Sequence, residues 1–240
     1  MNKKIYSHPF IITGFIVVFL LCLMAIFAPF FQSPITQNLS FRLQPPGSGS
    51  HLFGTDHFGR DILSRIFWSA RISLKVGIVA STLSLMIGVV LGMASGYFGG
   101  KIDTIIMRCT DIMMGFPALL FLIAISAAFE PGIETAMIAI GCVSWPSIAR
   151  LTRGQVLSVM TRDYIQAGKA MGYSHIRIIL NHVFPNCIAP VIVAFSLGIS
   201  GAIMAEASLS FLGLGVQPPS ASWGAMINEG KDFLRGAPWG

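Results

Sequence analysis

The stretch DYIQAGKAMGYSHIRIILNHVFP, from Asp163 to Pro185, is amphipathic and charged, and apolar segments flank it on both sides. Asp163 can cap a helix, and Gln166, three positions later, can close a capping box with it. Gly172 suits the left-handed residue that ends a helix. Ser174 can begin a second helix, and Pro185 disfavours helix in the residue before it and marks that helix's end. The sequence predicts two short helices joined at Gly172, and the first, at about nine residues, must dock on another surface to be stable.

The composition excludes an ordinary soluble protein. The chain has 240 residues, of which 54% are hydrophobic and only 11% are charged, whereas soluble domains carry about 25% charged residues. A soluble fold cannot hide that much apolar surface. The net charge is +6, but the basic residues are scattered without an aromatic and basic surface, so we expect no nucleic-acid partner. The sequence predicts an all-α, multi-pass bundle in the membrane lipid, with basic cytoplasmic loops.

The N-terminal region, residues 1–50, is expected to be a membrane anchor followed by an extracytoplasmic linker. Phe10–Phe31 has 22 residues without a charge, enough to span about 33 Å as a helix. A cleaved signal peptide is the alternative, but its apolar core runs for about 7–15 residues. Lys3 and Lys4 precede the span, so we expect an uncleaved anchor whose N-terminus is cytoplasmic.

Residues 51–75 form a second region, in which acidic residues alternate with arginines while Ile62, Ile66 and Phe67 share one helical face. This pattern is typical of an interfacial helix that leads into a span. Two interpretations stay open for it. It is either a charged lip that lies on the bilayer or a docking surface for an extracytoplasmic solute-binding protein.

Residues 76–240 are expected to form the core, with four more spans that bring the total to five. A polar turn, Lys101–Asp111, separates the first two of them, and we expect Pro117 to kink the third span of the chain. The segment after residue 208 is expected to be a re-entrant or outer loop. In chain order, the four spans are Val76–Gly100, Ile112–Phe129, Ile133–Ala149 and a segment from Pro185 to about Ala207.

Small residues recur at every fourth position in the second span, which places Ala80, Ser84, Gly88, Gly92 and Gly96 on one helical face. In a bundle of spans, such a face lets another helix approach closely. We therefore predict that the three glycines pack against a helix. Lining of a pore is the alternative for the same face.

Glu206 lies at the end of the fifth span, on a face that it shares with Ala194, Gly198 and Ala202. A buried carboxylate near the end of a span is costly unless it is solvated or paired. We expect Glu206 to point into the bundle or into a water-filled path. It is a candidate for the translocation path or gate, and a structural hydrogen-bond anchor is the alternative.

Residues 150–187 are expected to be a cytoplasmic loop. The segment from Arg150 to Pro185 carries five basic residues against the single acid Asp163. The three loops that join the preceding predicted spans alternate between the two sides of the membrane, which places this segment on the same side as Lys3 and Lys4. Both observations agree with the positive-inside rule.

Three blocks in this chain carry a family resemblance. Ala167, Gly172 and Pro185 match the spacing of the Glu-Ala-Ala, Gly, Leu-Pro motif of a cytoplasmic coupling loop, with Gln166, Gly168, His182 and Phe184 at its other positions. The sequence His182-Val-Phe-Pro-Asn186 is close to the form found in the peptide and nickel branch. Two more blocks, Gly54–Arg65 and Glu206–Gly215, resemble the same branch. The chain therefore resembles binding-protein-dependent ABC importer permeases of the dipeptide, oligopeptide and nickel branch.

The resemblance implies the transmembrane domain of a type I ABC importer in the inner (cytoplasmic) membrane, with a sixth span that we expect to be missing at the C-terminus. It implies alternating access for peptides or a related small solute such as a nickel complex. The implied partners are a second, non-identical permease subunit, two ATP-binding subunits that hydrolyse ATP, and an extracytoplasmic solute-binding protein. The coupling residues that it implies are Tyr164, Gln166, Ala167, Gly168, Gly172, His182 and Pro185.

No nucleotide-binding loop or hydrolase motif occurs in the sequence, so we expect no catalytic residue, no cofactor and no enzyme activity in this chain. Its four cysteines are far apart and lie in or beside apolar runs, which favours small apolar residues over a metal site. A stand-alone, ion-coupled secondary transporter or channel is the alternative function. That alternative predicts ionisable residues near the middle of several spans.

Overall fold

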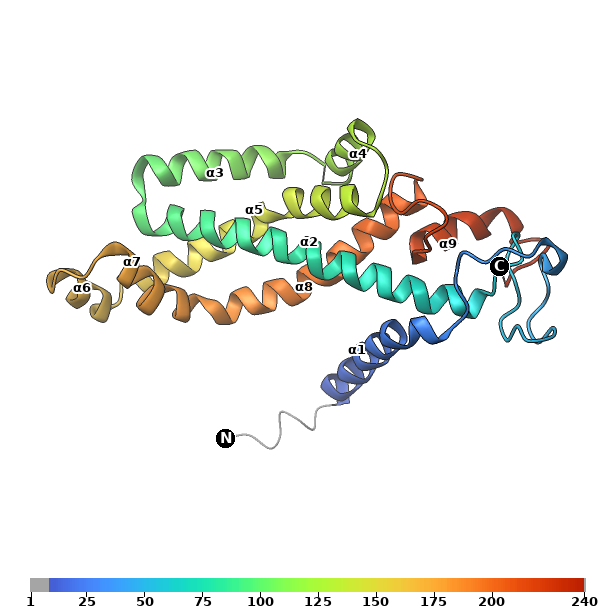
Figure 1. Cartoon of the computed structure of the whole chain (residues 1–240). Coiled ribbons are helices and arrows are strands. Elements are labelled where there is room, and N and C mark those ends of the chain that lie inside the picture. Colours follow the sequence, from blue (N-terminus) through green and yellow to red (C-terminus); the bar gives the residue numbers. More distant parts are fainter. Residues whose placement is uncertain (1–8, 240) are drawn as a thin grey trace. The chain divides into compact units, whose positions relative to one another are not determined.

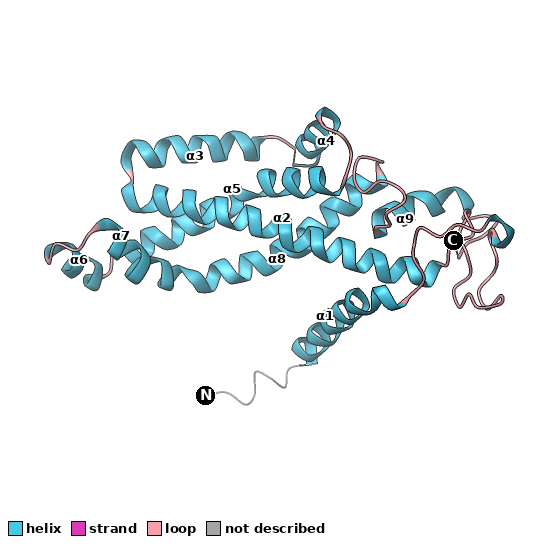
Figure 2. Cartoon of the chain, in the orientation of Figure 1, coloured by secondary structure: helices cyan, strands magenta, loops and turns pink. Residues whose placement is uncertain are grey.

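The computed structural model describes residues 9–239, and these residues form helices joined by loops (Figure 2). Within them there is no strand, and two isolated bridges join Ser48 to His51 and Thr55 to Asp61. The α-helices are α1 (Pro9–Phe27), α2 (Ile62–Phe98), α3 (Gly100–Gly115), α4 (Ala118–Ala128), α5 (Ile133–Met160), α6 (Asp163–Ala170), α7 (His175–Ile178), α8 (Phe184–Phe211) and α9 (Trp223–Gly230). The short helices are η1 (Ala28–Phe30), η2 (Leu39–Phe41), the π-helical η3 (Ile179–Val183) and η4 (Lys231–Phe233).

Contacts divide the chain into two compact units. Unit 1 comprises residues 1–75, 131–133 and 207–240, and unit 2 comprises residues 76–130 and 134–206. The helices α2 and α8 each contribute to both units. The predicted three-region organisation of the chain stays a prediction. Lys3 and Lys4 lie outside the described residues.

Several helices are suited to a membrane by length and composition. Pro9–Phe30, α2 and the continuous segment His175–Phe211 can each cross a bilayer, and the pair α3 and α4 gives a fourth candidate if it is one bent span. None of the side chains of α1 is buried, as is expected for a helix surrounded by lipid or by a partner subunit. The all-α fold of a multi-pass membrane protein is confirmed, whereas the number of five spans stays a prediction.

The predicted polar turn at 101–111 is wrong, because these residues belong to the helix α3. The chain reverses instead at Gly99 and Gly100, whose φ angles of 65° and 53° are left-handed and favour glycine. After α3 the helix breaks at Phe116 and Pro117, and α4 leaves at 89° to α3. Proline lacks the N–H that would continue the helix. The predicted kink at Pro117 is therefore a complete break.

The helix α2 begins at Ile62 and runs without interruption to Phe98, over 37 residues. The expected interfacial helix is thus the first part of α2. Its start is fixed by Asp61, whose Oδ2 accepts a hydrogen bond from the backbone N–H of Ser64 at 2.7 Å. An aspartate in this position satisfies a donor that the first turn of a helix leaves free.

The glycines of α2 lie against α5, and both helices run side by side in unit 2 (Figure 1). A Cβ atom at Gly92 would lie 2.5 Å from the backbone oxygen of Ala149, and one at Gly88 or Gly96 would lie under 3.0 Å from a side chain of α5. Any larger residue would force the two backbones apart. Ala80 and Ser84, on the same face, are also buried.

Candidate functional site

The segment between α5 and α8 forms two short helices that meet at Gly172, as the sequence predicts. Gly172 has a φ angle of 74°, and its N–H and that of Tyr173 donate to the carbonyls of Lys169 and Gly168. This is the hydrogen-bond pattern by which a left-handed glycine ends a helix. Ser174 caps α7 by accepting a hydrogen bond from the N–H of Arg177.

Two details of the predicted segment are wrong. The residue that precedes α6 as its cap is Arg162, without a side-chain cap, and the side-chain amide of Gln166 donates to the backbone oxygen of Met160 at 2.9 Å. Gln166 therefore ties α6 to the end of α5 in place of closing a capping box. Pro185 does not end the second helix either. The helix continues from α7 through the π-helical η3 into α8, where Pro185 is the second residue.

One face of this segment is packed into unit 2. Ile165 of α6, Ile178 of α7 and Val183 of η3 are each at most 1% exposed. They form one apolar cluster with residues from the ends of α2, α5 and α8: Met93, Tyr97, Val156, Val159 and Cys187. Burial of a large aliphatic side chain contributes about 1.5–3 kcal/mol. The two short helices are therefore held firmly on three longer ones.

Polar and aromatic contacts strengthen the same attachment. The hydroxyl of the buried Tyr97, near the end of α2, lies 2.9 Å from Nδ1 of His175, the first residue of α7. The ring of Tyr173 stacks on that of His182, and the guanidinium of Arg177 lies 4.1 Å from the centroid of the Tyr173 ring. These contacts join the turn after Gly172 to the π-helical turn before α8.

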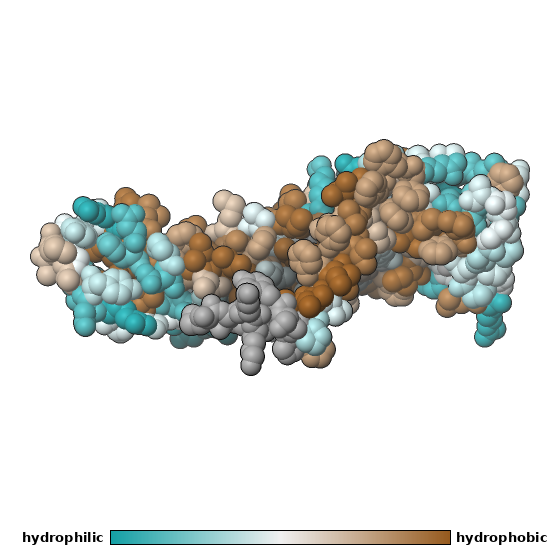
Figure 3. All heavy atoms as spheres, turned by 90° about the horizontal axis from the view of Figure 1, so that it is seen from below, coloured by the Kyte–Doolittle hydropathy of each residue, from teal (hydrophilic) through white to brown (hydrophobic). Residues whose placement is uncertain are grey.

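The opposite face of the segment is open. Tyr164, Met171, Ile176 and Leu180 are between 44% and 70% exposed. Hydrophilic side chains surround this end of unit 2, and apolar ones cover much of the neighbouring helices (Figure 3). An exposed apolar face rimmed by polar groups is typical of a protein–protein contact. Gln166, Ala167, Gly172 and Pro185 are exposed as well, His182 is half-buried and Gly168 is buried.

An ion pair fixes the hairpin between α2 and α3 on α5. Nε and Nη2 of Arg153 donate to the two carboxylate oxygens of Asp103 at 2.5 Å and 2.6 Å. The hydroxyl of Ser95 also donates to this carboxylate. Two parallel bonds of this kind fix orientation as well as distance. The end of unit 2 that carries α6 and α7 is thus braced by both apolar and ionic contacts.

A cavity of about 530 Å³ lies deeper in unit 2, between α2, α4, α5 and α8. It is lined by small residues, including Gly198 and Ala202, and by Ser81 and Ser84. The hydroxyls of these two serines are buried and have no hydrogen-bond partner in the described part of the chain. Glu206, the predicted gate residue, is completely buried and does not line this cavity.

Comparisons with known proteins agree with the resemblance. The model of the binding-protein-dependent transport system inner membrane component family matches residues 88–238, and that of the N-terminal TM domain of oligopeptide transport permease C matches residues 3–46. The dipeptide transport system permease protein DppC of Alkalihalophilus pseudofirmus is 44% identical over 239 residues, which cover 99% of this chain and 78% of the relative. The oligopeptide transport system permease protein OppC of Bacillus subtilis is 41% identical over 235 residues, covering 97% and 77% respectively.

The chain belongs to the binding-protein-dependent ABC permeases, in their dipeptide and oligopeptide branch. A solved structure agrees at the level of the fold. A chain of the inward-facing MetNI methionine ABC transporter superposes with a TM-score of 0.61 at 16% identity, over 73% of this permease and 84% of that chain. The expected family and the expected type of membrane fold are both confirmed.

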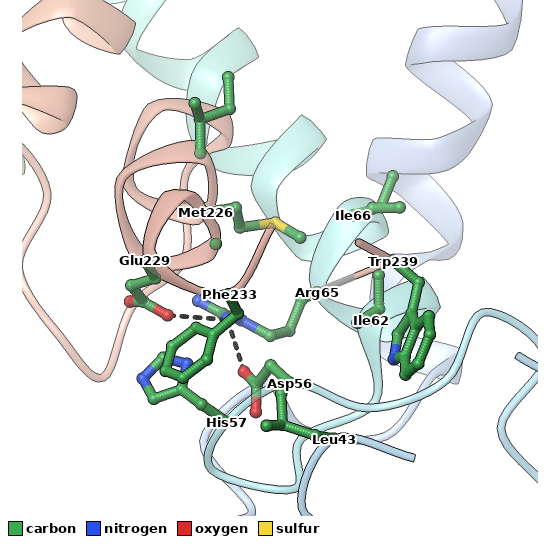
Figure 4. A pocket seen from close by; sticks show the side chains of 12 residues that line it. Leu43, Asp56, His57, Ile62, Arg65, Ile66, Met226, Glu229, Phe233 and Trp239 are labelled. Carbon is green, nitrogen blue, oxygen red and sulfur yellow. Dashed lines mark hydrogen bonds and ion pairs between the residues drawn. The ribbon is translucent and has the colours of Figure 1, made fainter. Parts of the chain in front are cut away.

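Unit 1 of the permease contains a buried ion-pair network that the sequence does not predict. Figure 4 shows the part of it that Arg65 forms with Asp56 and Glu229. Arg60 donates from Nε to Asp56 and from Nη2 to Glu229, both at 2.6 Å. Nη1 of Arg65 donates to Asp56 at 2.6 Å and forms an ion pair with Glu229 at 2.9 Å. The network joins the loop before α2 to α9, across more than 160 residues of sequence. Both arginines lie in the block Gly54–Arg65, which carries part of the family resemblance, but Glu229 has no local sequence signal that pairs it with them.

The network sets the charge states of its members. Burial alone would raise the pKa of Asp56, but the N–H of Arg60 and the charges of Arg65 and Arg60 outweigh it and hold the pKa below its ordinary value. Burial lowers the pKa of the adjacent His57, and the carboxylates of Asp56 and Glu229 offset this effect only in part.

Ligand atoms of Asp56, His57 and Glu229 lie within 4.8 Å of one another, which is close enough for a metal ion. The two carboxylates, however, are already paired with two guanidinium groups. A cation at this position would face two fixed positive charges. The donor set therefore fits an ion-pair network better than a metal centre.

Proposed function

We propose that this chain is a permease subunit of an ATP-driven importer that carries dipeptides or short peptides across the cytoplasmic membrane. The observation that carries the proposal is the attachment of α6 and α7 to the ends of α2, α5 and α8 through one buried cluster. The relatives described above are named as dipeptide and oligopeptide permeases, which favours peptides over nickel complexes as the solute.

In the proposed mechanism, α6 and α7 form the coupling segment, and their exposed apolar face lies in a cleft of a cytoplasmic ATP-binding subunit. Closure of two such subunits on ATP pushes the coupling segment. Because Ile165, Ile178 and Val183 are buried against three longer helices, the displacement passes to those helices and not into a flexible loop. The solute path then opens alternately to each side of the membrane.

The remaining partners follow from the same proposal. A second permease subunit completes the path, and co-purification is the direct test for it. An extracytoplasmic binding protein delivers the solute. The cavity lined by Ser81, Ser84 and Gly198 is the candidate for this chain's share of the path. Glu206 is proposed as an internal anchor at the end of that region, because its side chain is fully buried.

The proposal is tested by replacing Gly172 with valine in the complete importer, reconstituted in lipid vesicles. A β-branched residue at a φ angle of 74° stores strain of about 1–3 kcal/mol and displaces α6 from α7. We expect peptide-stimulated ATP hydrolysis to fall about tenfold, the factor that corresponds to about 1.4 kcal/mol. Basal hydrolysis by the ATP-binding subunits should stay unchanged.

Gly168→Ala is the matched control. A Cβ atom there would lie 3.4 Å from the ring of Tyr173, which is an ordinary contact, and alanine favours helix by about 1 kcal/mol over glycine. We expect full stimulation by peptide in this variant. Undiminished stimulation in Gly172→Val would contradict the proposed coupling.

A further inference from the structure

The helix α3 packs on α2 and α5 with one side and carries two exposed basic side chains, Lys101 and Arg108, on the other (Figure 1). These two residues are seven positions apart, close to two turns of an α-helix, so they lie one above the other along about 10 Å of its length. Ile105 and Ile112 share this face and are 64% and 63% exposed. Cations and isoleucines therefore alternate along what we call the basic face of α3.

The two cations of the basic face are not balanced by acids of the chain. Asp103, on the opposite side of α3, is paired with Arg153 of α5. Asp111 is paired with Arg150, from the same helix. In the described part of the chain, neither cation of the basic face forms an ion pair. This region of unit 2 thus keeps two uncompensated positive charges at its surface, which favours an anionic partner.

The basic face lies at the depth where a helix leaves the polar end of unit 2. The helix α3 begins directly after the reversal at the end of α2, where Tyr97 contacts His175 of α7. Lys101 is therefore at the same end of unit 2 as α6 and α7. Residues 112–129, which follow, contain no charged side chain. The cations stand at the boundary between a charged and an apolar length of chain, which is the level of lipid headgroups in a membrane helix.

Helix geometry brings the charge of Arg108 toward this same level. Side chains of an α-helix lean toward its N-terminus, which for α3 is the end at Lys101. The long side chain of Arg108 can thus run along the helix to the headgroup level while its apolar stem stays beside the isoleucines. Cations above exposed apolar side chains match the order of phosphate and acyl chains in a phospholipid. A free phosphate would leave the isoleucines uncovered.

We propose that the basic face of α3 binds an anionic phospholipid. Lys101 and Arg108 hold its phosphate, and Ile105 and Ile112 contact its acyl chains. Basic side chains near a membrane surface attract anionic lipid, whereas the headgroup cation of a zwitterionic lipid opposes both of them. This site is additional to the transport of peptides proposed above and does not depend on it.

The test uses the full-length chain, with the subunits that remain bound to it, in lipid nanodiscs without nucleotide. Cys109 is exposed and adjoins Arg108, so a bimane fluorophore on it reports on this region once every other cysteine is replaced by serine. Phosphatidylcholine nanodiscs receive increasing shares of brominated phosphatidylglycerol or brominated phosphatidylcholine, which quench the fluorophore on contact. We expect half-quenching at an at least about fivefold lower content of the anionic lipid, the contribution of a single basic side chain.

Three paired substitutions locate the site. Lys101→Gln with Arg108→Gln removes both charges, and half-quenching should then occur at the same content of either lipid. Lys101→Arg with Arg108→Lys exchanges the cations and should keep the preference. Arg42→Gln with Arg235→Gln is the matched control, because it removes two charges at exposed residues of unit 1 and should also keep the preference. The thermal unfolding midpoint checks the fold, and if the first pair does not fold, each of its single substitutions should lower the preference.

Three outcomes would overturn the proposal. Equal half-quenching contents in the unaltered chain would show that this face does not select an anionic lipid. A preference that survives removal of both charges would place the selecting charges elsewhere. An absence of quenching by either lipid would show that a bound subunit covers the face. None of these readouts involves ATP hydrolysis, so the result of the Gly172→Val experiment is independent of them.

Discussion

The side chain of Gly92 is a single hydrogen atom, and this small size allows the close approach of α2 and α5. A Cβ atom there would lie 2.5 Å from the backbone oxygen of Ala149, and neither backbone can move without disturbing the contacts of Gly88 and Gly96. Glycine is otherwise unfavourable inside a helix by about 1 kcal/mol. The close approach of α2 and α5 is the physical reason for keeping it there.

Replacing a glycine inside a helix by alanine usually raises stability. For Gly92→Ala we expect stability to fall instead. We expect the free energy of unfolding to fall by about 1–3 kcal/mol, the cost of overpacking. In Gly154→Ala, within α5, a Cβ atom meets nothing within 4 Å, and stability should rise by up to about 1 kcal/mol. Thermal unfolding of the purified chain in detergent compares the two variants. Equal effects would show that the contact is absent.

Asp56 is a second single residue on which we expect the stability of the fold to depend. Its carboxylate is buried and bonded to Arg60 and Arg65. Asp56→Asn leaves these two buried charges with only Glu229 as a carboxylate partner, and breaking a buried pair in this way costs about 3–5 kcal/mol. The exposed Asp232, changed to asparagine, should alter stability by less than about 0.5 kcal/mol. Unfolding of both variants by denaturant is the measurement.

The same cluster predicts how stability depends on pH. The pKa of His57 lies below its ordinary value of 6.5, so the unfolded chain takes up this proton first as the pH falls. Stability should therefore decline below about pH 6.5. Asp56, whose pKa lies below 3.8, contributes its full stabilisation above that value and loses it as the pH falls through its folded pKa. His57→Gln should flatten the first decline only, and an unchanged profile from pH 7 to 5 would contradict the assignment.

At the scale of the element, the coupling segment is two helices of eight and four residues, which could not persist alone in water. Their stability comes from the cluster around Ile165 and Ile178 and from the contact of Tyr97 with His175. The proposed transmission of movement depends on the same contacts. Stability and coupling are therefore linked in this segment.

Tyr97→Phe removes the hydroxyl and keeps the ring in the cluster. We expect a loss of about 0.5–1.5 kcal/mol in stability, the net value of one hydrogen bond, and about two- to tenfold less peptide-stimulated ATP hydrolysis. His175→Ala serves as the partner in a double-mutant cycle. If the two residues act through their contact, the double variant should be no worse than the more severe single one. Fully additive losses would show that they act independently.

At the scale of the whole molecule, the proposed orientation places residues 163–178 in the cytoplasm and the linker before Gly54 outside. This can be tested with single cysteines on a background in which the native cysteines are replaced by serine. A membrane-impermeant maleimide should label Arg42→Cys in intact cells. It should label Lys169→Cys only after the membrane is opened, and labelling of Lys169→Cys in intact cells would contradict the proposed coupling to an ATPase.

Much of the local structure follows from short-range patterns. The uncharged run at 10–31, the left-handed Gly172 and the cap at Ser174 were each predictable, because chain length, φ preference and hydrogen bonding by the nearest side chain decide them. Where a long-range contact competes, the local signal fails. Gln166 bonds to Met160 and not to the start of its own helix, and the helix passes through Pro185 because the cluster at Val183 and Cys187 holds both sides of it.

The sequence by itself determined that this protein is a helical membrane permease with a bent pair of helices between two spans, since composition, periodicity and motif spacing are properties of the chain alone. Only the tertiary structure decided which surfaces meet: α5 against the glycines of α2, Tyr97 against His175, and Glu229 against arginines that precede it by more than 160 positions. The reason is that close packing and buried ion pairs depend on distances across the fold, and no local pattern encodes those distances.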